Sequence, residues 1–367
     1  MKACFSQPDD ARVCVIVPVY NGENTIARCL RSICRQTYGN IVVAAVDDGS
    51  TDGTWGIINK VARNDPRVVP IHQNNQGSVS ARFRGVSFAK DSEIPYICFC
   101  DADDTLPSKS VEMLINAIVE SKTDLVCGNM RKKWRCFPLP DSFKADCFKN
   151  ADLSVYNRVE IRQQLINSFF GVSNFPVSLW AKLYKTSVLT GQINDEPIVR
   201  FYGDDLSITL RVVLDTDSLC IIPDTVYNYH IGGATGGYMP TMLEDFIKLY
   251  RFRQSVIDKY GLNTDCSDLM AAEAMNYLRT YFSRILEHKK ELQKDRQRFL
   301  EIIEKTISEP LFRNAATMVT ERGWNNRMAP LVNSGSADEI AEWIEKYNNS
   351  IRNSIKGRVR GILNKLA

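Results

Sequence analysis

Acidic residues stand at two places in the first third of the chain where an apolar run ends. Asp47 follows the run Ile41–Val46, and Asp101 and Asp103 follow the run Tyr96–Cys100. Carboxylates gathered at one rim repel one another and lose hydration, so they persist most easily where a cation is bound. Oxygen ligands alone favour Mg²⁺ or Mn²⁺, which bind few protein carboxylates together with substrate phosphates. These residues therefore predict a site for a nucleoside diphosphate bridged by a metal.

The elements that must position these residues alternate between strand and helix over the first 130 residues. Apolar residues at helical spacing separate the short strands, which indicates right-handed crossovers and a mostly parallel sheet of the α/β class. Ligands bind at the carboxyl ends of such strands, where Asp47, Asp101 and Asp103 are expected to lie. The predicted strands are Val13–Val19, Ile41–Val46, Val68–Ile71, Tyr96–Cys100 and Leu125–Cys127.

The pattern loosens after residue 130 and becomes mostly helical after residue 235. Lys132, Lys133 and Trp134 are interpreted as part of a loop. We therefore expect an α/β domain over residues 1–235, a helical domain over 236–350 and a basic tail over 351–367. The predicted later elements are a strand at Leu219–Ile222 and helices at Ile161–Phe170, Leu206–Leu214, Leu243–Tyr260 and Met270–Leu300.

Composition limits the class of protein. The 367 residues are 44% hydrophobic and 24% charged, which is typical of globular domains, and a net charge of +3 does not indicate a nucleic-acid partner. The run Val13–Val19 is too short to cross a bilayer. Asp9 and Asp10 interrupt the place where a signal peptide would be apolar. We expect a cytoplasmic protein whose 11 scattered cysteines are buried thiols.

The region after the first strand excludes two common nucleotide-binding classes. Neither a Walker loop nor a Gly-x-Gly-x-x-Gly motif follows Val19, so a P-loop enzyme and a dinucleotide dehydrogenase are not expected. Other acidic and hydroxyl residues near the strand ends can equally be ordinary turn and capping residues. These residues are Asp48, Ser50, Asp52 and Asp104.

Several segments, taken in order, resemble the family 2 glycosyltransferases of the GT-A fold. The similarity is specific over about residues 12 to 130 and weaker to about residue 235. The segments are Val15–Asn21, Gln36–Tyr38, Asp47–Asp52, Asn75–Gly77, Ser80–Arg82 and Asp101–Asp104, then Trp180–Lys185, Gly203–Asp205 and Tyr227–His230.

The resemblance implies inverting transfer of a sugar from a nucleotide-sugar, with a UDP-sugar as the favoured donor and Mn²⁺ or Mg²⁺ as the metal. Asp103 would ligate the metal, with Asp101 beside the metal and the ribose. Arg82 would face the nucleotide or brace the loop, and Ala102 completes the acidic segment. The residues that would hold the base are Pro18, Val19, Tyr20 and Asp47.

The pair Asp204 and Asp205 matches the family position of the general base, with Asp205 as the base and Asp204 as a conservative departure. A carboxylate can take the proton of a sugar hydroxyl as it attacks the anomeric carbon. The same pair can also cap a helix that begins near Leu206. His230 stands where relatives carry arginine, and it could contact the diphosphate or the acceptor, or simply pack. Ala181 and Phe83 stand where relatives carry asparagine.

The last 17 residues combine apolar positions at helical spacing with five basic residues and no acidic ones. Such a helix suits an anionic membrane surface, which would fit a lipid-linked or glycan acceptor in the assembly of a cell-surface polysaccharide. Docking on the helical domain and disorder remain alternatives. Two other functions also remain open: a catalytically silent subunit that binds sugar-nucleotide or glycan, and a nucleotidyltransferase.

Overall fold

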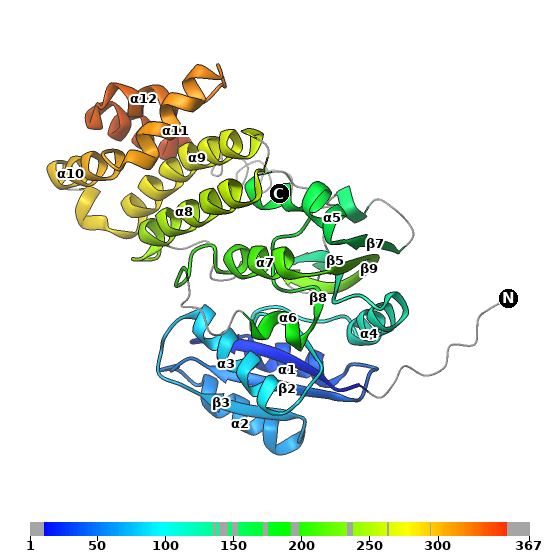
Figure 1. The fold of residues 1–367 in the computed structure, drawn as a ribbon. Coiled ribbons are helices and arrows are strands. Elements are labelled where there is room, and N and C mark those ends of the chain that lie inside the picture. Colours follow the sequence, from blue (N-terminus) through cyan, green and yellow to red (C-terminus); the bar gives the residue numbers. More distant parts are fainter. Residues whose placement is uncertain are drawn as a thin grey trace, which may run out of the picture. The chain divides into compact units, whose positions relative to one another are not determined.

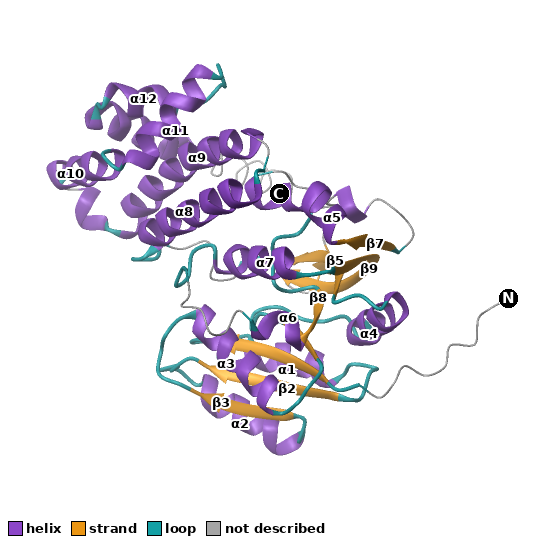
Figure 2. Ribbon diagram, in the orientation of Figure 1, coloured by secondary structure: helices purple, strands orange, loops and turns teal. Residues whose placement is uncertain are grey.

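The computed structural model describes residues 11–134, 137–138, 146–148, 153–171, 175–191, 198–232, 238–262, 264–293 and 295–350. The chain divides into two compact units, Met1–Gly236 and Gly237–Ala367. The first unit is α/β and the second is helical (Figure 1; Figure 2). No helix within the described ranges is long and apolar enough to span a membrane. The predictions about the first ten residues and the tail 351–367 fall outside these ranges.

One mixed sheet runs through the first unit in the order β3-β2-β1-β4-β8-β5-β9-β7, with β6 paired to β5. The first four strands of this order are parallel, which confirms the α/β crossovers predicted from the sequence. β8 then pairs antiparallel with both β4 and β5. The strands are β1 Val13–Val19, β2 Ile41–Asp47, β3 Val68–His72, β4 Tyr96–Phe99, β5 Leu125–Trp134, β6 Phe137–Pro138, β7 Ser154–Asn157, β8 Lys182–Lys185 and β9 Ser218–His230.

Helices cover both faces of this sheet because successive strand residues point to opposite sides. On β1, Val13, Val15 and Val17 pack in one cluster with residues of α1, α2 and α4. Ile16 faces the other way, where a Cβ built on Gly85 of α3 would lie 2.5 Å from its side chain. Glycine therefore lets α3 approach the sheet closely. The helices are α1 Ile26–Cys34, α2 Thr54–Asn64, α3 Ser78–Asp91, α4 Ser110–Ser121, α5 Arg158–Glu160, α6 Thr186–Thr190 and α7 Asp204–Asp215.

Three local predictions in this unit need correction. Lys132, Lys133 and Trp134 are not in a loop but continue β5, which pairs in parallel with β9 as far as His230. The strand predicted at Leu219–Ile222 is accordingly longer, since β9 continues to the same histidine. Ile161–Phe170 is helical but not a regular α-helix: it forms a π turn and then a 3₁₀ turn.

The second unit is built from α-helices around an aromatic core. Phe246 stacks on Tyr277 with ring centroids 3.8 Å apart, and Phe312 lies 6.0 Å from Phe246. The single helix predicted at Met270–Leu300 is wrong, because two helices and a 3₁₀ turn occupy that range. The elements are α8 Met242–Tyr260, α9 Thr264–His288, the 3₁₀ turn Lys290–Gln293, α10 Arg296–Ile307, α11 Pro310–Glu321 and α12 Met328–Ser334, and residues 337–350 are also helical.

Candidate active site

The carboxyl ends of β1, β2 and β4 lie at one edge of the sheet, as the parallel strands require. Asp47 pairs with Val19, while Ile16 pairs with Phe99, two residues before Asp101. β1 lies between the other two strands, so about 10 Å separates the backbones of Asp47 and Asp101, at roughly 4.8 Å per strand. The structure therefore brings the predicted acidic residues to one edge but keeps Asp47 apart from the other two.

The acidic segment after β4 forms a tight turn. The Asp104 N–H donates to the Asp101 carbonyl over 3.0 Å. Asp101 and Asp103 therefore do not continue β4 as an extended segment, because the chain reverses within these four residues. Ala102, at the second position of the turn, carries no polar side chain that could add a ligand. Burial raises the pKa of Asp103, and Arg28 opposes that rise.

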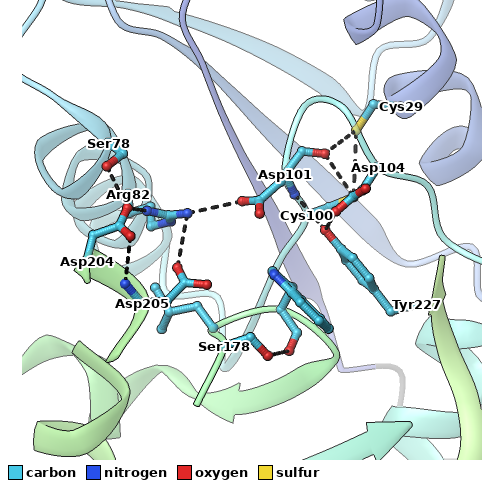
Figure 3. Close-up of polar contacts among 12 residues, drawn as sticks. Cys29, Ser78, Arg82, Cys100, Asp101, Asp104, Ser178, Asp204, Asp205 and Tyr227 are labelled. Carbon is cyan, nitrogen blue, oxygen red and sulfur yellow. Dashed lines mark hydrogen bonds and ion pairs between the residues drawn. The ribbon is translucent and has the colours of Figure 1, made fainter. Parts of the chain in front are cut away.

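The Tyr227 hydroxyl of β9 holds this turn in place through two hydrogen bonds. Its hydroxyl donates to Asp104 Oδ2 over 2.8 Å and accepts from the Asp101 N–H over 3.1 Å (Figure 3). The His230 N–H donates to Asp104 Oδ1 over 2.6 Å. Burial raises the pKa of Asp104 to about 8, and these bonds to the carboxylate oppose that rise. Asp104 thus has a structural role, which decides one alternative that the sequence left open.

Arg82 of α3 joins the acidic turn to the predicted base. Its Nη2 lies 3.1 Å from Asp101 Oδ1 and 3.2 Å from Asp205 Oδ1, and its Nη1 pairs with Asp204 (Figure 3). The guanidinium side chain is only 7% exposed. Burial alone would lower the pKa of Arg82, but Asp204, Asp205 and Asp101 outweigh it and raise that pKa. We call these four residues the Arg82 cluster.

Asp204 and Asp205 occupy the first turn of α7, where the helix dipole favours negative charge. Gly203 stands at the N-cap and makes no capping bond through a side chain, so neither aspartate is the N-cap residue. Ser78 donates to Asp204 Oδ2 over 2.6 Å, which fixes this carboxylate beside Arg82. Asp205 is left with one oxygen 3.2 Å from Arg82.

The Asp205 carboxyl has the pKa expected of a base that works near neutral pH. Burial raises this pKa to about 7, Arg82 opposes the rise, and Asp204 and Asp101 add to it. A carboxylate with such a pKa can accept a proton near pH 7 and still be ionised there for much of the time. This pKa is an independent reason to consider Asp205 as a general base.

Asp47 is fully buried at the end of β2. Its Oδ2 lies 2.8 Å from His72 Nδ1, and its Oδ1 has no hydrogen-bond partner among the described residues. A buried carboxylate oxygen of this kind invites a donor from a ligand. Tyr20 directly follows β1 and is 51% exposed, so its ring can meet a ligand. Pro18 and Val19 are the last two residues of β1.

Three other residues near the strand ends hold loops in place. Asp48 accepts from the backbone N–H groups of Gln76 and Gly77, and its carboxylate also accepts from Gln73. Asp52 accepts from the Thr54 N–H at the start of α2. Ser50 Oγ accepts from the Asn21 N–H over 2.9 Å. The turn and capping interpretation holds for all three.

The two carboxylates of the acidic turn fit a divalent cation held jointly with a substrate. Within the described part of the chain, no three Asp, Glu, His or Cys side chains form a group that could hold a metal. Magnesium commonly uses only one or two protein carboxylates, with phosphates and waters completing its shell. Burial raises the pKa of Asp101, and the neighbouring Asp103 and Asp204 add to the rise while Arg82 opposes it. A cation at this turn would relieve that repulsion.

The residues that sequence reasoning missed are aromatic or lie on neighbouring strands. His72 ends β3 beside Asp47, where the same rule about strand ends could have found it. Trp180 stacks on Tyr227 at 4.5 Å and lies 5.9 Å from the Tyr229 ring. His230 was predicted as a site residue, and its Nε2 lies 3.0 Å from Thr105 Oγ1, next to the acidic turn. The stacking has no signal in the sequence, because Trp180 and the tyrosines of β9 are far apart along the chain.

Comparisons with known proteins agree with this geometry. A profile of the family described as Glycosyl transferase family 2 matches residues 14–137. This matched segment, about a third of the chain, is similar to the family 2 glycosyltransferases. The matched segment contains Asp47, Arg82 and the acidic turn, and Asp204 and Asp205 lie beyond it.

Two relatives and one solved structure are also similar to this chain. Glycosyltransferase GlyA of Streptococcus pneumoniae is 32% identical over 228 residues, which are 60% of this chain and 31% of GlyA. Chondroitin synthase of Pasteurella multocida is 40% identical over 115 residues, which are 31% of this chain and 12% of the synthase. The chain thus spans less than a third of either relative.

The crystal structure of S. aureus TarS residues 1–349 in complex with UDP-GlcNAc has a TM-score of 0.58 and 18% identity to this chain. The match covers 94% of this chain and 92% of that one. The likeness shows that the chain shares the GT-A fold of TarS, as the resemblance implied, and it covers the helical region after the α/β unit as well.

Proposed function

We propose that the chain is an inverting glycosyltransferase that moves a sugar from a UDP-sugar to a hydroxyl of a glycan. The Arg82 cluster carries this proposal, because one guanidinium holds Asp205 and Asp101 within about 3.2 Å of it. A candidate base and a candidate diphosphate site therefore face the same small space. The similarity to family 2 glycosyltransferases and the UDP-GlcNAc bound in the TarS crystal structure support the class of donor.

The donor is held at the carboxyl edge of the sheet. Asp47 Oδ1 accepts the N–H of a pyrimidine base, which supplies the partner that this buried oxygen lacks in the protein. Tyr20 packs against the base with its exposed ring. The diphosphate then extends toward the turn that carries Asp101 and Asp103.

The acidic turn holds a divalent cation through Asp101 and Asp103. Bound there, Mn²⁺ or Mg²⁺ supplies charge stabilisation for the departing diphosphate. Tyr227 and the His230 N–H keep the turn in place through Asp104. Titration calorimetry with UDP and Mn²⁺ should show about tenfold or greater loss of affinity in Asp103→Asn. Asp65→Asn, at the C-terminal end of α2, serves as the control.

Asp205 takes the proton of the acceptor hydroxyl as its oxygen attacks the anomeric carbon. The bond from that carbon to the diphosphate oxygen breaks at the same time, so the anomeric centre inverts. Arg82 orients the carboxylate and opposes the rise of its pKa, which favours the ionised form. Asp204 holds Arg82 from the opposite side and is itself held by Ser78.

The deciding experiment compares Asp205→Asn with wild type. A thermal-shift panel of UDP- and GDP-sugars with Mn²⁺ first selects the donor, and UDP or GDP release then measures turnover. We expect Asp205→Asn to lose about 10²- to 10⁴-fold in turnover, the usual contribution of a general base. Asp217→Asn, whose side chain is 74% exposed, should keep wild-type turnover. Equal turnover in wild type and Asp205→Asn would refute the assignment, and no turnover with any donor would favour a silent binding subunit.

The acceptor is a cell-surface glycan, and we place the enzyme at the cytoplasmic face of a membrane through residues 351–367. The basic and apolar composition of this segment supports the placement. Deleting residues 351–367 should move the protein from membrane to soluble fractions. Unchanged fractionation would remove membrane binding from the proposal and leave sugar transfer untouched.

A further inference from the structure

The two carboxylate oxygens of Asp47 have different surroundings, and the proposed function uses only one of them. Oδ1 has no hydrogen-bond partner among the described residues, whereas Oδ2 lies 2.8 Å from Nδ1 of His72. The whole side chain is buried, and burying an ionised carboxylate costs free energy unless hydrogen bonds satisfy it. The partner of Oδ2 therefore helps to determine where Oδ1 can point.

The register of the sheet brings His72 to this carboxylate. Asp47 and His72 are partners in the parallel pairing of β2 with β3, and each is the last residue of its strand. Paired residues of neighbouring parallel strands project from the same face of the sheet, so the imidazole can reach the carboxylate. Val19 of β1 pairs with Asp47 on the other side, but its side chain cannot donate a hydrogen bond. His72 is thus the strand-end neighbour that can hold Asp47.

The hydrogen bond between the two side chains has a defined direction. An ionised carboxylate only accepts hydrogen bonds, so His72 carries a proton on Nδ1 and donates it to Asp47 Oδ2. The imidazole also packs against Trp55 of α2, with ring centroids 5.1 Å apart. The His72 side chain is 49% exposed, whereas that of Asp47 is fully buried. The histidine therefore reaches from the surface to an interior carboxylate and fixes its orientation.

We propose that His72 is a positioning residue for Asp47, which determines the base that the donor site accepts. With Oδ2 bound to His72, the carboxylate cannot rotate freely, and Oδ1 is kept as the acceptor for an incoming N–H group. Uracil carries such a group at its third ring atom. Cytosine has no hydrogen there and would place a lone pair against the carboxylate. The inference rests on the proposed function, because it assumes that Asp47 contacts the base of the donor.

The relative affinity for UDP and CDP measures this hydrogen bond directly. The two nucleotides have nearly the same size, so the fit of the ring contributes little to the difference between them. A site that bonds a substrate N–H strongly rejects an analogue without it, and we expect wild type to bind UDP at least about 10²-fold more tightly than CDP. Loss of the His72 donor lets the carboxylate turn, which lowers both the affinity for UDP and its ratio to that for CDP.

The experiment compares three variants of the 367-residue chain, each titrated with UDP and with CDP in the presence of Mn²⁺. His72→Phe removes the donor but keeps a ring against Trp55. His72→Asn does the reverse, because its amide N–H group lies near the place of Nδ1 while the ring is absent. His288→Phe, at the exposed end of α9, is the matched control. Calorimetry gives affinity and stoichiometry, and UDP release from the selected donor gives KM and kcat.

We expect His72→Phe to bind UDP about tenfold more weakly and to lose about tenfold of its preference over CDP, the size of one hydrogen bond to a charged group. Donor KM should rise by a similar factor while kcat stays within about twofold, since the contact is the same in the ground and transition states. His72→Asn should remain within about threefold of wild type, because it restores the donor. His288→Phe should match wild type. If His72→Phe does not fold, His72→Val decides the question.

Two results would overturn the inference. The first is an unchanged ratio of UDP to CDP affinity in His72→Phe. The second is an equal loss in His72→Phe and His72→Asn, which would show that the N–H donor is not what matters. Asp47→Asn is measured beside them. If it keeps the wild-type ratio, or if wild type does not distinguish UDP from CDP, the proposed base contact itself fails. If Asp47→Asn alone loses the ratio, only the present inference fails, and Asp205→Asn tests sugar transfer separately.

Discussion

The guanidinium of Arg82 lies 3.2 Å from the Asp205 carboxylate, on a nitrogen that also reaches Asp101. The charge of Arg82 therefore balances acidic groups from two places, the turn after β4 and the start of α7. Because the Arg82 side chain is only 7% exposed, water screens these pairs little. The position of Asp205, the proposed base, and the position of the acidic turn are thus linked through one residue.

Replacing Arg82 by lysine tests this link. Lysine keeps the charge, but its compact ammonium cannot reach three carboxylates with the fixed fork of a guanidinium. We expect turnover to fall by about 10²-fold or more, and the unfolding temperature to fall as well. Arg84→Lys is the matched control, because Arg84 lies two residues further along α3 and its side chain is exposed. Turnover within threefold of wild type in Arg82→Lys would contradict a positioning role.

The pH dependence of turnover should follow the ionisation of Asp205. The base must be ionised, and burial raises its pKa to about 7. We therefore expect kcat/KM to rise about tenfold per pH unit below pH 7 and to level off above it. Profiles between pH 5 and 9 with the selected donor check this expectation. A flat profile across pH 7 would show that another group accepts the proton.

The free energy of unfolding should also depend on pH through Asp205, but it should fall where turnover rises. A carboxyl whose pKa is raised on folding binds its proton more tightly in the folded state, so its stabilising contribution is complete below about pH 4. That contribution is lost as pH rises through about 7. Asp205→Asn should therefore gain stability relative to wild type at pH 8 and less at pH 5, as measured by urea unfolding. An equal effect at both values would contradict the raised pKa.

Tyr227→Phe should destabilise the acidic turn without creating a cavity in the core. The variant keeps the ring that stacks on Trp180 but loses the hydroxyl bonds to Asp101 and Asp104. Leaving these buried groups unpaired costs about 1–3 kcal/mol of stability. We also expect weaker UDP binding in the presence of Mn²⁺, measured by calorimetry. Full affinity in a variant of lowered stability would show that the turn does not depend on this anchor.

Ala181 offers a prediction about stability alone. Its φ of 59° lies in the left-handed region, which costs an L-residue with a Cβ roughly 1 kcal/mol. Asparagine, which the family resemblance led us to expect at this position, is better tolerated in this region. Ala181→Gly should raise the free energy of unfolding by about 0.5–1 kcal/mol, whereas Ala117→Gly inside α4 should lower it. Destabilisation by both changes would argue against strain at Ala181.

The local part of the fold could be predicted from the sequence, because β1 to β4 and their helices carry periodic apolar patterns. The pairing of β8 between β4 and β5 could not, since it joins Leu183 to residues far along the chain. The break between α9 and α10 was missed for another reason: neither Gly nor Pro marks it. Asp295, whose side chain accepts from the Arg298 N–H, was the available signal for a new helix.

Within the site, the strand-end rule located the acidic residues but not their contacts. The chain order gives no sign that Arg82 would meet Asp101, Asp204 and Asp205 together. It also cannot show that the acidic segment forms a turn, because Asp and Ala occur in turns and extended segments alike. Such features depend on side-chain contacts between separate elements, which only the folded chain defines.

The insertion of β8 has a consequence for how the protein is made. The four parallel strands can pair as soon as they emerge, because each follows its neighbour closely in the chain. The strand that separates β4 from β5 is synthesised more than fifty residues after β5 begins, and α7 later still. Asp47, Arg82 and Asp101 can therefore be in place on a nascent chain before Asp205 has been synthesised. If the proposed roles are right, the growing chain acquires the residues for donor binding before it acquires the base.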